Sequence, residues 1–169
     1  MSLPPLPLNA IVIAADVPDW RAAVTLAAEA LTASGSAKPE YAGEMIRMIE
    51  EHGPYVVIAP GLALAHARPG PAVIADGLSI VTLATPVKFG HPHNDPVRVV
   101  LGLAIASAGE HLAAVAAVAN VFNDSSAIAD LAAATTPEQV QHIMRGGAEG
   151  IAPAIPRPQR RPSLRGRAE

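Results

Sequence analysis

The segment at residues 97–106, VRVVLGLAIA, constrains the fold most strongly because it is almost continuously apolar. A strand that faces water on one side alternates apolar and polar residues, whereas a strand buried on both faces is apolar throughout. The segment is also too short to cross a membrane as a helix. We therefore predict a central strand whose sheet is covered by helices on both faces.

Shorter strands are predicted on the N-terminal side of this segment. A Pro60-Gly61 turn separates two short apolar runs, and Thr85-Pro86 closes a third run that lies before the polar loop FGHPHNDP. These strands are expected at residues 9–15, 56–59, 62–67 and 78–84.

Helices are predicted where apolar residues recur every three or four positions. The first begins at Asp16-Val-Pro-Asp19 and ends at the Ser34-Gly35 turn. The second runs from Pro39 to His52, and its buried side is expected to carry Tyr41, Met45, Met48 and Ile49. A third begins at the capping-box spacing Ser107-x-x-Glu110. Its buried residues are expected to be Leu112, Val115, Ala119 and Phe122, and two shorter helices are expected at 125–133 and 137–144.

This order of elements predicts an α/β fold: a single-domain layered sandwich with a mixed β-sheet flanked by helices, spanning residues 1–148. Residues 149–169 are rich in Pro and Arg and have little to bury, so we expect a disordered tail. The first 150 residues carry seven Lys/Arg and fourteen Asp/Glu, whereas residues 151–169 carry five Arg and one Glu. Because the domain is acidic and the tail has few charges, no nucleic-acid partner is expected.

The absence of cysteine from all 169 residues excludes several kinds of site. Disulfides, thiolate zinc sites and a cysteine nucleophile are all impossible. The N-terminus, MSLPPLPLNA, has no positive region before its apolar residues, so no secretory signal is expected. These features predict a cytoplasmic protein that does not insert into the membrane.

The segment LALAHARPG ends an apolar strand in a histidine and an arginine. In an extended chain Leu62, Leu64, His66 and Arg68 share one face, and Pro69 keeps Arg68 extended. Apolar surroundings favour the neutral imidazole, which is the nucleophilic form, and a guanidinium matches the oxygens of a phosphoryl group. This pattern is compatible with a nucleophilic imidazole beside a cation that suits an incoming phosphoryl group.

His111 is predicted to lie at the start of a helix, just after the central strand. Helix N-termini present free N–H groups to anions, and clefts beyond the carboxyl ends of strands bind ligands in open α/β sheets. If His66 lies in the same cleft, the two imidazoles, Arg68 and the helix N-terminus form one phosphate-binding set.

Simpler interpretations exist for each of these residues. His66 can be a structural residue at a strand end, His111 a surface residue and Arg68 a solvated cation. His91-Pro-His93 resembles a metal pair, but zinc needs three or four ligands, and only Asp95 and distant histidines could complete the set. Asn94-Asp95-Pro96 is ordinary turn chemistry.

Three segments together resemble the enzyme IIA component of the bacterial phosphoenolpyruvate-dependent sugar phosphotransferase system: GPYVVIAPGLALAHARPG, TPVKFGHPHNDPVRVVLGLAIAS and GEHLAAVAAVANVF. The resemblance is to the fructose/mannitol class, most of all to its ascorbate-type branch, and covers roughly residues 20–145.

The resemblance implies a mixed-sheet α/β sandwich in which His66 is the phosphorylated nucleophile and His111 the second active-site histidine. His66 would accept a phosphoryl group from the phosphohistidine of HPr and pass it to a cysteine of a separate enzyme IIB, which serves a membrane enzyme IIC. Mannitol-type members carry an active-site arginine upstream of the histidine, but the spacing of Arg47 does not match it. No metal or other cofactor is implied.

Within this hypothesis, Arg68 offsets negative charge, and Asn94 and Asp95 lie at the rim of the cleft. Two other functions fit the same residues. One is a regulatory phosphocarrier that is not coupled to transport. The other is a non-enzymatic module that binds a metal or small anion through His66, His91, His93 and His111.

Overall fold

Residues 97–104 of the apolar segment form the middle strand of a five-stranded sheet in the computed structural model, which describes residues 3–123 and 126–149. The strand order is β1-β4-β5-β3-β2. β3 runs parallel to β5 and β4 antiparallel to it, so the sheet is mixed as predicted. The strands are β1 Ile11–Ala15, β2 Val57–Ala59, β3 Leu62–His66, β4 Gly77–Val87 and β5 Val97–Ala104.

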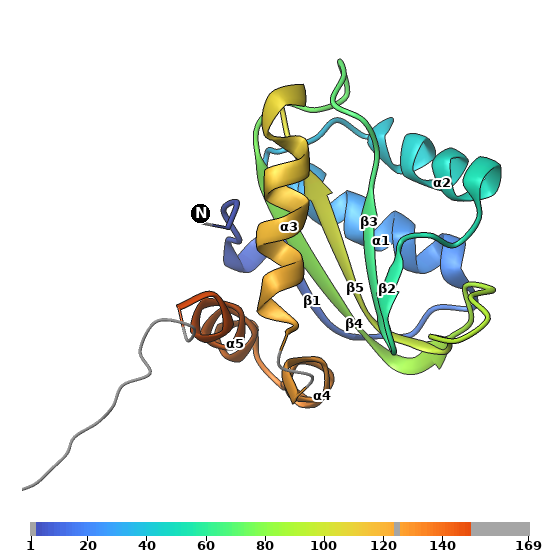
Figure 1. Cartoon of the computed structure of the whole chain (residues 1–169). Coiled ribbons are helices and arrows are strands. Elements are labelled where there is room, and N and C mark those ends of the chain that lie inside the picture. The colour runs from blue at the N-terminus through green and yellow to red at the C-terminus, as the bar shows by residue number, and fades with distance from the viewer. Residues whose placement is uncertain (1–2, 124–125, 150–169) are drawn as a thin grey trace, which may run out of the picture.

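Helices cover both faces of this sheet, as the apolar central strand requires (Figure 1). One layer contains α1 and α2, and the other contains α3, α4 and α5. Alternation along β3 divides its side chains between the two cores: Ala63 and Ala65 pack with α1 and α2, whereas Leu62 and Leu64 pack with α3 to α5. The helices are α1 Trp20–Ala33, α2 Tyr41–His52, α3 His111–Val121, α4 Ser126–Ala133 and α5 Pro137–Glu149, with 3-10 turns at Leu8–Ala10 and Ala108–Glu110.

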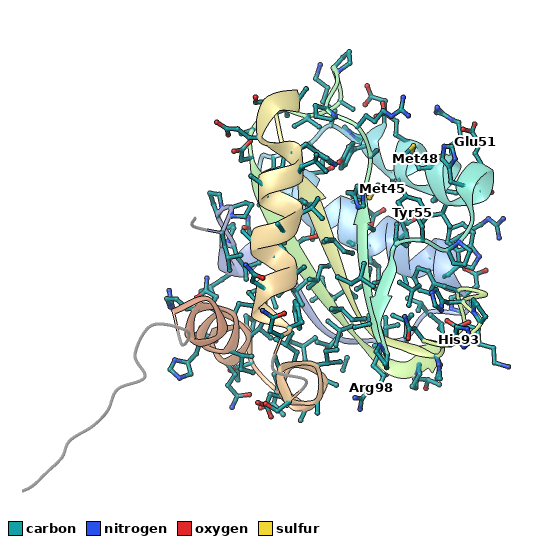
Figure 2. All side chains as sticks on the ribbon, viewed as in Figure 1. Met45, Met48, Glu51, Tyr55, His93 and Arg98 are labelled. Carbon is teal, nitrogen blue, oxygen red and sulfur yellow. The ribbon has the colours of Figure 1, made fainter. Side chains whose placement is uncertain are left out.

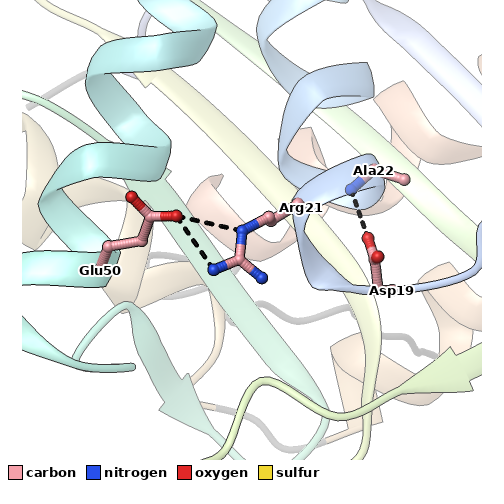
Figure 3. Close-up of polar contacts among 4 residues, drawn as sticks. All are labelled: Asp19, Arg21, Ala22 and Glu50. Carbon is pink, nitrogen blue, oxygen red and sulfur yellow. Dashed lines mark hydrogen bonds and ion pairs between the residues drawn. The ribbon is translucent and has the colours of Figure 1, made fainter.

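A side chain caps the start of α1, and a polar contact joins α1 to α2 (Figure 3). The Asp19 carboxylate caps α1 by accepting from the Ala22 N–H at 2.9 Å. The Arg21 guanidinium lies 3.0 Å from the Glu50 carboxylate of α2, but both side chains are about half exposed, so this ion pair adds little stability. The buried side chains of Tyr41, Met45 and Ile49 hold α2 on the sheet.

Two predicted strand boundaries are wrong. β4 continues through Thr85-Pro86 to Val87, because β1 pairs with β4 only as far as Leu83 and a proline beyond that point removes no hydrogen bond to β1. β1 begins at Ile11 rather than Asn9, because residues 8–10 form a 3-10 turn.

The predicted start and buried side of the third helix are also wrong. The Ser107 side chain makes no capping bond; a 3-10 turn follows it, and α3 begins at His111 itself. The buried residues are Ala114, Ala117, Val118 and Val121, whereas Leu112 is 81% exposed. Nearly every position of this helix is apolar, so spacing alone does not identify the side that packs on the sheet.

The C-terminal part differs in length from the prediction. α5 continues through Gly146-Gly147 to Glu149, and α4 begins at Ser126; Ser125 and the predicted tail from 150 onward lie outside the described residues. In the described ranges no single helix is long and apolar enough to cross a membrane. The segments Ala108–Val121 and Ser126–Ala133 together have the length and apolar composition of a membrane span, but they are bent by 82° at the break between them.

Candidate active site

A cleft of about 420 Å³ opens at the carboxyl end of β3, where the two helix layers meet. Side chains from α2, from the segment between α2 and β2, from the end of β3 and from the start of α3 line it. These residues are Met48, His52, Tyr55, His66, Arg68 and His111. The structure therefore brings together three of the predicted site residues, namely His66, Arg68 and His111.

His66 is the last residue of β3 and is partly buried. Its Nδ1 lies 2.9 Å from the carbonyl oxygen of Leu64, two residues earlier on the same strand. The Tyr55 ring meets the imidazole edge-on, with ring centroids 5.7 Å apart. Burial lowers the pKa of His66 below its ordinary value; the bond to Leu64 partly opposes this effect, and nearby His111 lowers the pKa further. The neutral imidazole is thereby favoured.

His111 is the first residue of α3, and its ring centroid lies 5.4 Å from that of His66. The Nδ1 atom of His111 is buried and bonds to no polar atom of the described residues. A buried N–H without an acceptor costs more than an unused lone pair, so we place the ring proton on Nε2.

Arg68 lies at the junction of this cleft with a second one of about 280 Å³. Its side chain is exposed, and its charge opposes the rise that burial causes in the pKa of Tyr55. Within residues 3–123 and 126–149 it forms no ion pair, which leaves its guanidinium available to an anion. Arg47 lines only the second cleft and not the one that contains His66.

Asn94 and Asp95 do not lie at the rim of this cleft, contrary to the prediction. They precede β5, and the carbonyl of Asn94 accepts from the N–H of Gly61 before β3 begins, so they are at the opposite end of these parallel strands from His66. The Asp95 carboxylate accepts from the backbone N–H groups of residues 89, 90 and 91 and thereby shapes its own loop. The prediction therefore placed both residues at the wrong end of the sheet.

The His91–His93 pair belongs to the same distant loop. Figure 2 shows His93 and Arg98 at one end of the sheet and Met48 and Tyr55 toward the other. The His91 Nδ1 accepts from the N–H groups of His93 and Asn94, so the ring stabilises the loop. Across the ranges that the structure describes, no three His, Asp or Glu side chains are grouped so that they could hold a metal ion.

Three lining residues were missed from the sequence: Met48, His52 and Tyr55. Met48 was assigned to the buried side of α2, His52 carried no motif, and Tyr55 follows α2 in a short connection. The position of α2 over the end of β3 brings them to the cleft, and no local pattern encodes that position.

The cleft contains the groups needed to accept a negatively charged electrophile. His66 supplies a neutral imidazole, His111 an N–H donor and Arg68 a fixed positive charge. Because these groups are in place before a ligand arrives, the protein needs little reorganisation to stabilise developing charge.

The sequence matches the family described as "Phosphoenolpyruvate-dependent sugar phosphotransferase system, EIIA 2" over residues 5–146. It is 35% identical over 137 residues to the ascorbate-specific PTS system EIIA components of Salmonella choleraesuis and Escherichia coli K12, which covers 80% of this chain and 89% of each relative.

Solved structures show the same fold. A candidate PTS IIA protein, PtxA, from Streptococcus mutans superimposes with a TM-score of 0.76 at 34% identity, over 86% of this chain and 92% of that one. The enzyme IIAMTL complex with phosphorylated enzyme IIBMTL from Escherichia coli matches with a TM-score of 0.74 over 84% of this chain and 99% of that one. At 23% identity, the second likeness concerns the fold alone.

Proposed function

This chain belongs to the EIIA 2 family of the phosphoenolpyruvate-dependent sugar phosphotransferase system, and we propose that it carries the phosphoryl group on His66. The group comes from the phosphohistidine of HPr and passes to a cysteine of enzyme IIB, in the cytoplasm. The observation that carries the proposal is the 5.4 Å separation of the His66 and His111 rings in a cleft that Arg68 also lines.

The contact with the Leu64 carbonyl indicates which ring nitrogen of His66 takes the phosphoryl group. A carbonyl oxygen only accepts hydrogen bonds, so the His66 Nδ1, which lies 2.9 Å from it, holds the single proton of the neutral ring. Nε2 then bears the free lone pair and is the nucleophile. As the Nε2–P bond forms, positive charge develops on the ring, and the Leu64 carbonyl stabilises it through the Nδ1–H.

His111 stabilises the phosphoryl group rather than carrying it. With its ring proton on Nε2, it donates a hydrogen bond to a phosphoryl oxygen that lies between the two rings. Arg68 supplies a positive charge at the mouth of the same cleft. In a loose, in-line phosphoryl transfer, such positioning and charge stabilisation provide most of the catalysis.

Each of the two transfers exchanges one bond to phosphorus for another. In the first, the N–P bond of the HPr phosphohistidine breaks, and its electron pair remains on that ring as the Nε2–P bond of His66 forms. In the second, a thiolate of enzyme IIB attacks phosphorus, so an S–P bond forms while the His66 N–P bond breaks. In the Escherichia coli complex, IIAMTL is bound to phosphorylated IIBMTL; for this chain the enzyme IIB acceptor is inferred from its membership of the family.

The transported sugar is proposed from the relatives. Proteins 35% identical to this chain are named ascorbate-specific, so ascorbate is the first substrate to test. The sugar binds the membrane enzyme IIC and not this protein.

The test is phosphorylation of the purified chain by radiolabelled phosphoenolpyruvate, enzyme I and HPr. We expect acid-labile phosphate on the wild type, none on His66→Ala and slower labelling of His111→Ala. His142→Ala is the matched control, since His142 is an exposed histidine of α5 that does not line the cleft, and it should label at the wild-type rate. Acid-labile labelling of His66→Ala would overturn the assignment.

A further inference from the structure

The hydroxyl of Tyr41 lies between the ends of β3 and β5. Tyr41 begins α2 and is fully buried. Its hydroxyl donates to the carbonyl of Leu103 at 2.8 Å and accepts from the N–H of Ala67 at 3.1 Å, with a longer contact of 3.3 Å to the Ala67 carbonyl. One side-chain oxygen therefore joins α2 to two strands at once.

The two backbone groups that Tyr41 joins are neighbours of the proposed nucleophile. His66 and Leu103 are paired at the end of the parallel β3–β5 ladder, and Ala67 is the next residue of the chain. A ladder that continued by one residue would bring the Ala67 N–H to the Leu103 carbonyl directly. The Tyr41 hydroxyl occupies that place, so the two strands separate immediately after His66.

We propose that Tyr41 is a positioning residue for His66: its hydroxyl holds β3 and β5 apart at Ala67 and so sets the directions of the His66 imidazole and Arg68. The proposal rests on the function proposed above. Tyr41 does not line the cleft and is inaccessible to a partner protein, so it acts only through these neighbours.

Burial makes this arrangement hard to replace. Ala67 is only 4% exposed and Leu103 1%, so without the hydroxyl their N–H and C=O groups would lack a partner or the strands would close on each other. If the strands closed on each other, both His66 and Arg68 would be displaced, and phosphoryl transfer is sensitive to displacements of about 1 Å. Burial also raises the pKa of Tyr41 to about 12, so the hydroxyl keeps its proton near neutral pH.

The variant that tests this is Tyr41→Phe, with Ser79→Ala as the matched control. The hydroxyl of Ser79 is also fully buried and donates to a backbone carbonyl, that of Ala27 at 2.7 Å, but it belongs to β4 and contacts α1. Both variants lose one buried hydroxyl, and only Tyr41→Phe alters the end of β3. Circular dichroism establishes that each variant is folded at the assay temperature.

Three measurements are compared. The first is the initial rate of labelling by phospho-HPr, which should fall about tenfold or more in Tyr41→Phe at unchanged KM for HPr, and stay within about twofold in Ser79→Ala. The second is the NMR signals of the His66 ring without any phosphoryl donor, which should shift in Tyr41→Phe alone. The third is hydrogen exchange of the Ala67 amide in the wild type, which should be as slow as in the strands.

These measurements distinguish failure of this proposal from failure of the proposed function. If the wild type takes up no phosphate, the ring signals and the Ala67 amide still test the positioning role. Unchanged His66 signals in folded Tyr41→Phe, a labelling rate lowered equally in both variants, or rapid exchange of the Ala67 amide would each overturn it. The exchange of the Ala67 amide is measured in the wild type, so this test does not depend on whether a variant folds.

Discussion

The ring of His66, at the end of β3, lies 5.4 Å from the ring of His111, at the start of α3. The parallel pairing of β3 with β5 places the ends of both strands together, and α3 follows β5 after a short turn. The bond of His66 to Leu64 and its closeness to Arg68, by contrast, arise along β3 and its continuation, since Leu64 and Arg68 lie two residues to either side of it.

The pH dependence of His66 follows from its burial. Because burial and His111 lower its pKa, the folded value lies below the ordinary value of about 6.5. We expect an NMR titration midpoint below 6.5 and a labelling rate that rises with pH through that midpoint and levels off above it. A midpoint at or above 6.5 would contradict the burial argument.

The same shift affects stability. As pH falls below about 6.5, the unfolded state binds the His66 proton first, so the free energy of unfolding decreases until the folded ring is also protonated. Urea unfolding from pH 8 to pH 5 should therefore show a steeper loss in the wild type than in His66→Ala. Equal slopes would mean that His66 is not the group responsible.

Arg68 is expected to contribute charge and geometry. Arg68→Ala should lower the labelling rate about tenfold, and Arg68→Lys should recover only part of it, because an ammonium lacks the planar fork of the guanidinium. Arg98→Ala is the control, since Arg98 is an exposed arginine on β5 toward the other end of the sheet (Figure 2). Full activity of Arg68→Ala would remove Arg68 from the site.

Asp95 is expected to matter for stability and not for transfer. Asp95→Ala removes a carboxylate that accepts three backbone N–H groups, so the free energy of unfolding should fall by about 2 kcal/mol. The labelling rate of the folded variant should remain within about twofold of the wild type. A large loss of rate at unchanged stability would place Asp95 in the catalytic cleft after all.

Tyr41 should control the alkaline stability of the fold. Its pKa is raised to about 12, mainly by burial, so the unfolded chain loses this proton first, from about pH 10. Between pH 10 and 12 the wild type should lose roughly 2–3 kcal/mol of stability that Tyr41→Phe does not lose. Tyr55→Phe is the variant to compare with Tyr41→Phe. It also removes a tyrosine hydroxyl whose pKa is raised by burial, but the Tyr55 side chain is partly exposed whereas Tyr41 is fully buried.

Ala14 offers a stabilising substitution away from the site. Its φ of 54° lies in the left-handed region, which favours glycine, and its side chain is exposed. Ala14→Gly should raise the free energy of unfolding by about 0.5–1 kcal/mol, while the Ala14 N–H keeps its bond to Thr82. Ala15→Gly, at the neighbouring position of the same strand, should be destabilising. Thermal unfolding of the two variants measures the difference.

Local patterns predicted some features of the site and missed others. Alternation along β3 predicted that His66 shares the face of Leu62 and Leu64, and its ring does lie against His111 of α3, the helix layer on which those leucines pack. The buried side of α3 was wrong because an almost wholly apolar helix has no distinct apolar side. Tyr41 was predicted only as a core residue, because the periodicity of α2 carries no information about which backbone groups its hydroxyl bonds to.

The sequence by itself determined the order of strands and helices, the burial of β5 on both faces and the place of His66 and Arg68 at the end of an apolar strand. These features depend on local period and composition. Only the tertiary structure decided that His111, Tyr55 and the Tyr41 hydroxyl converge on that end, while Asn94 and Asp95 lie at the other. Strand pairing and helix packing join residues distant in the chain, and the register that joins them is set by the whole core rather than by any one segment.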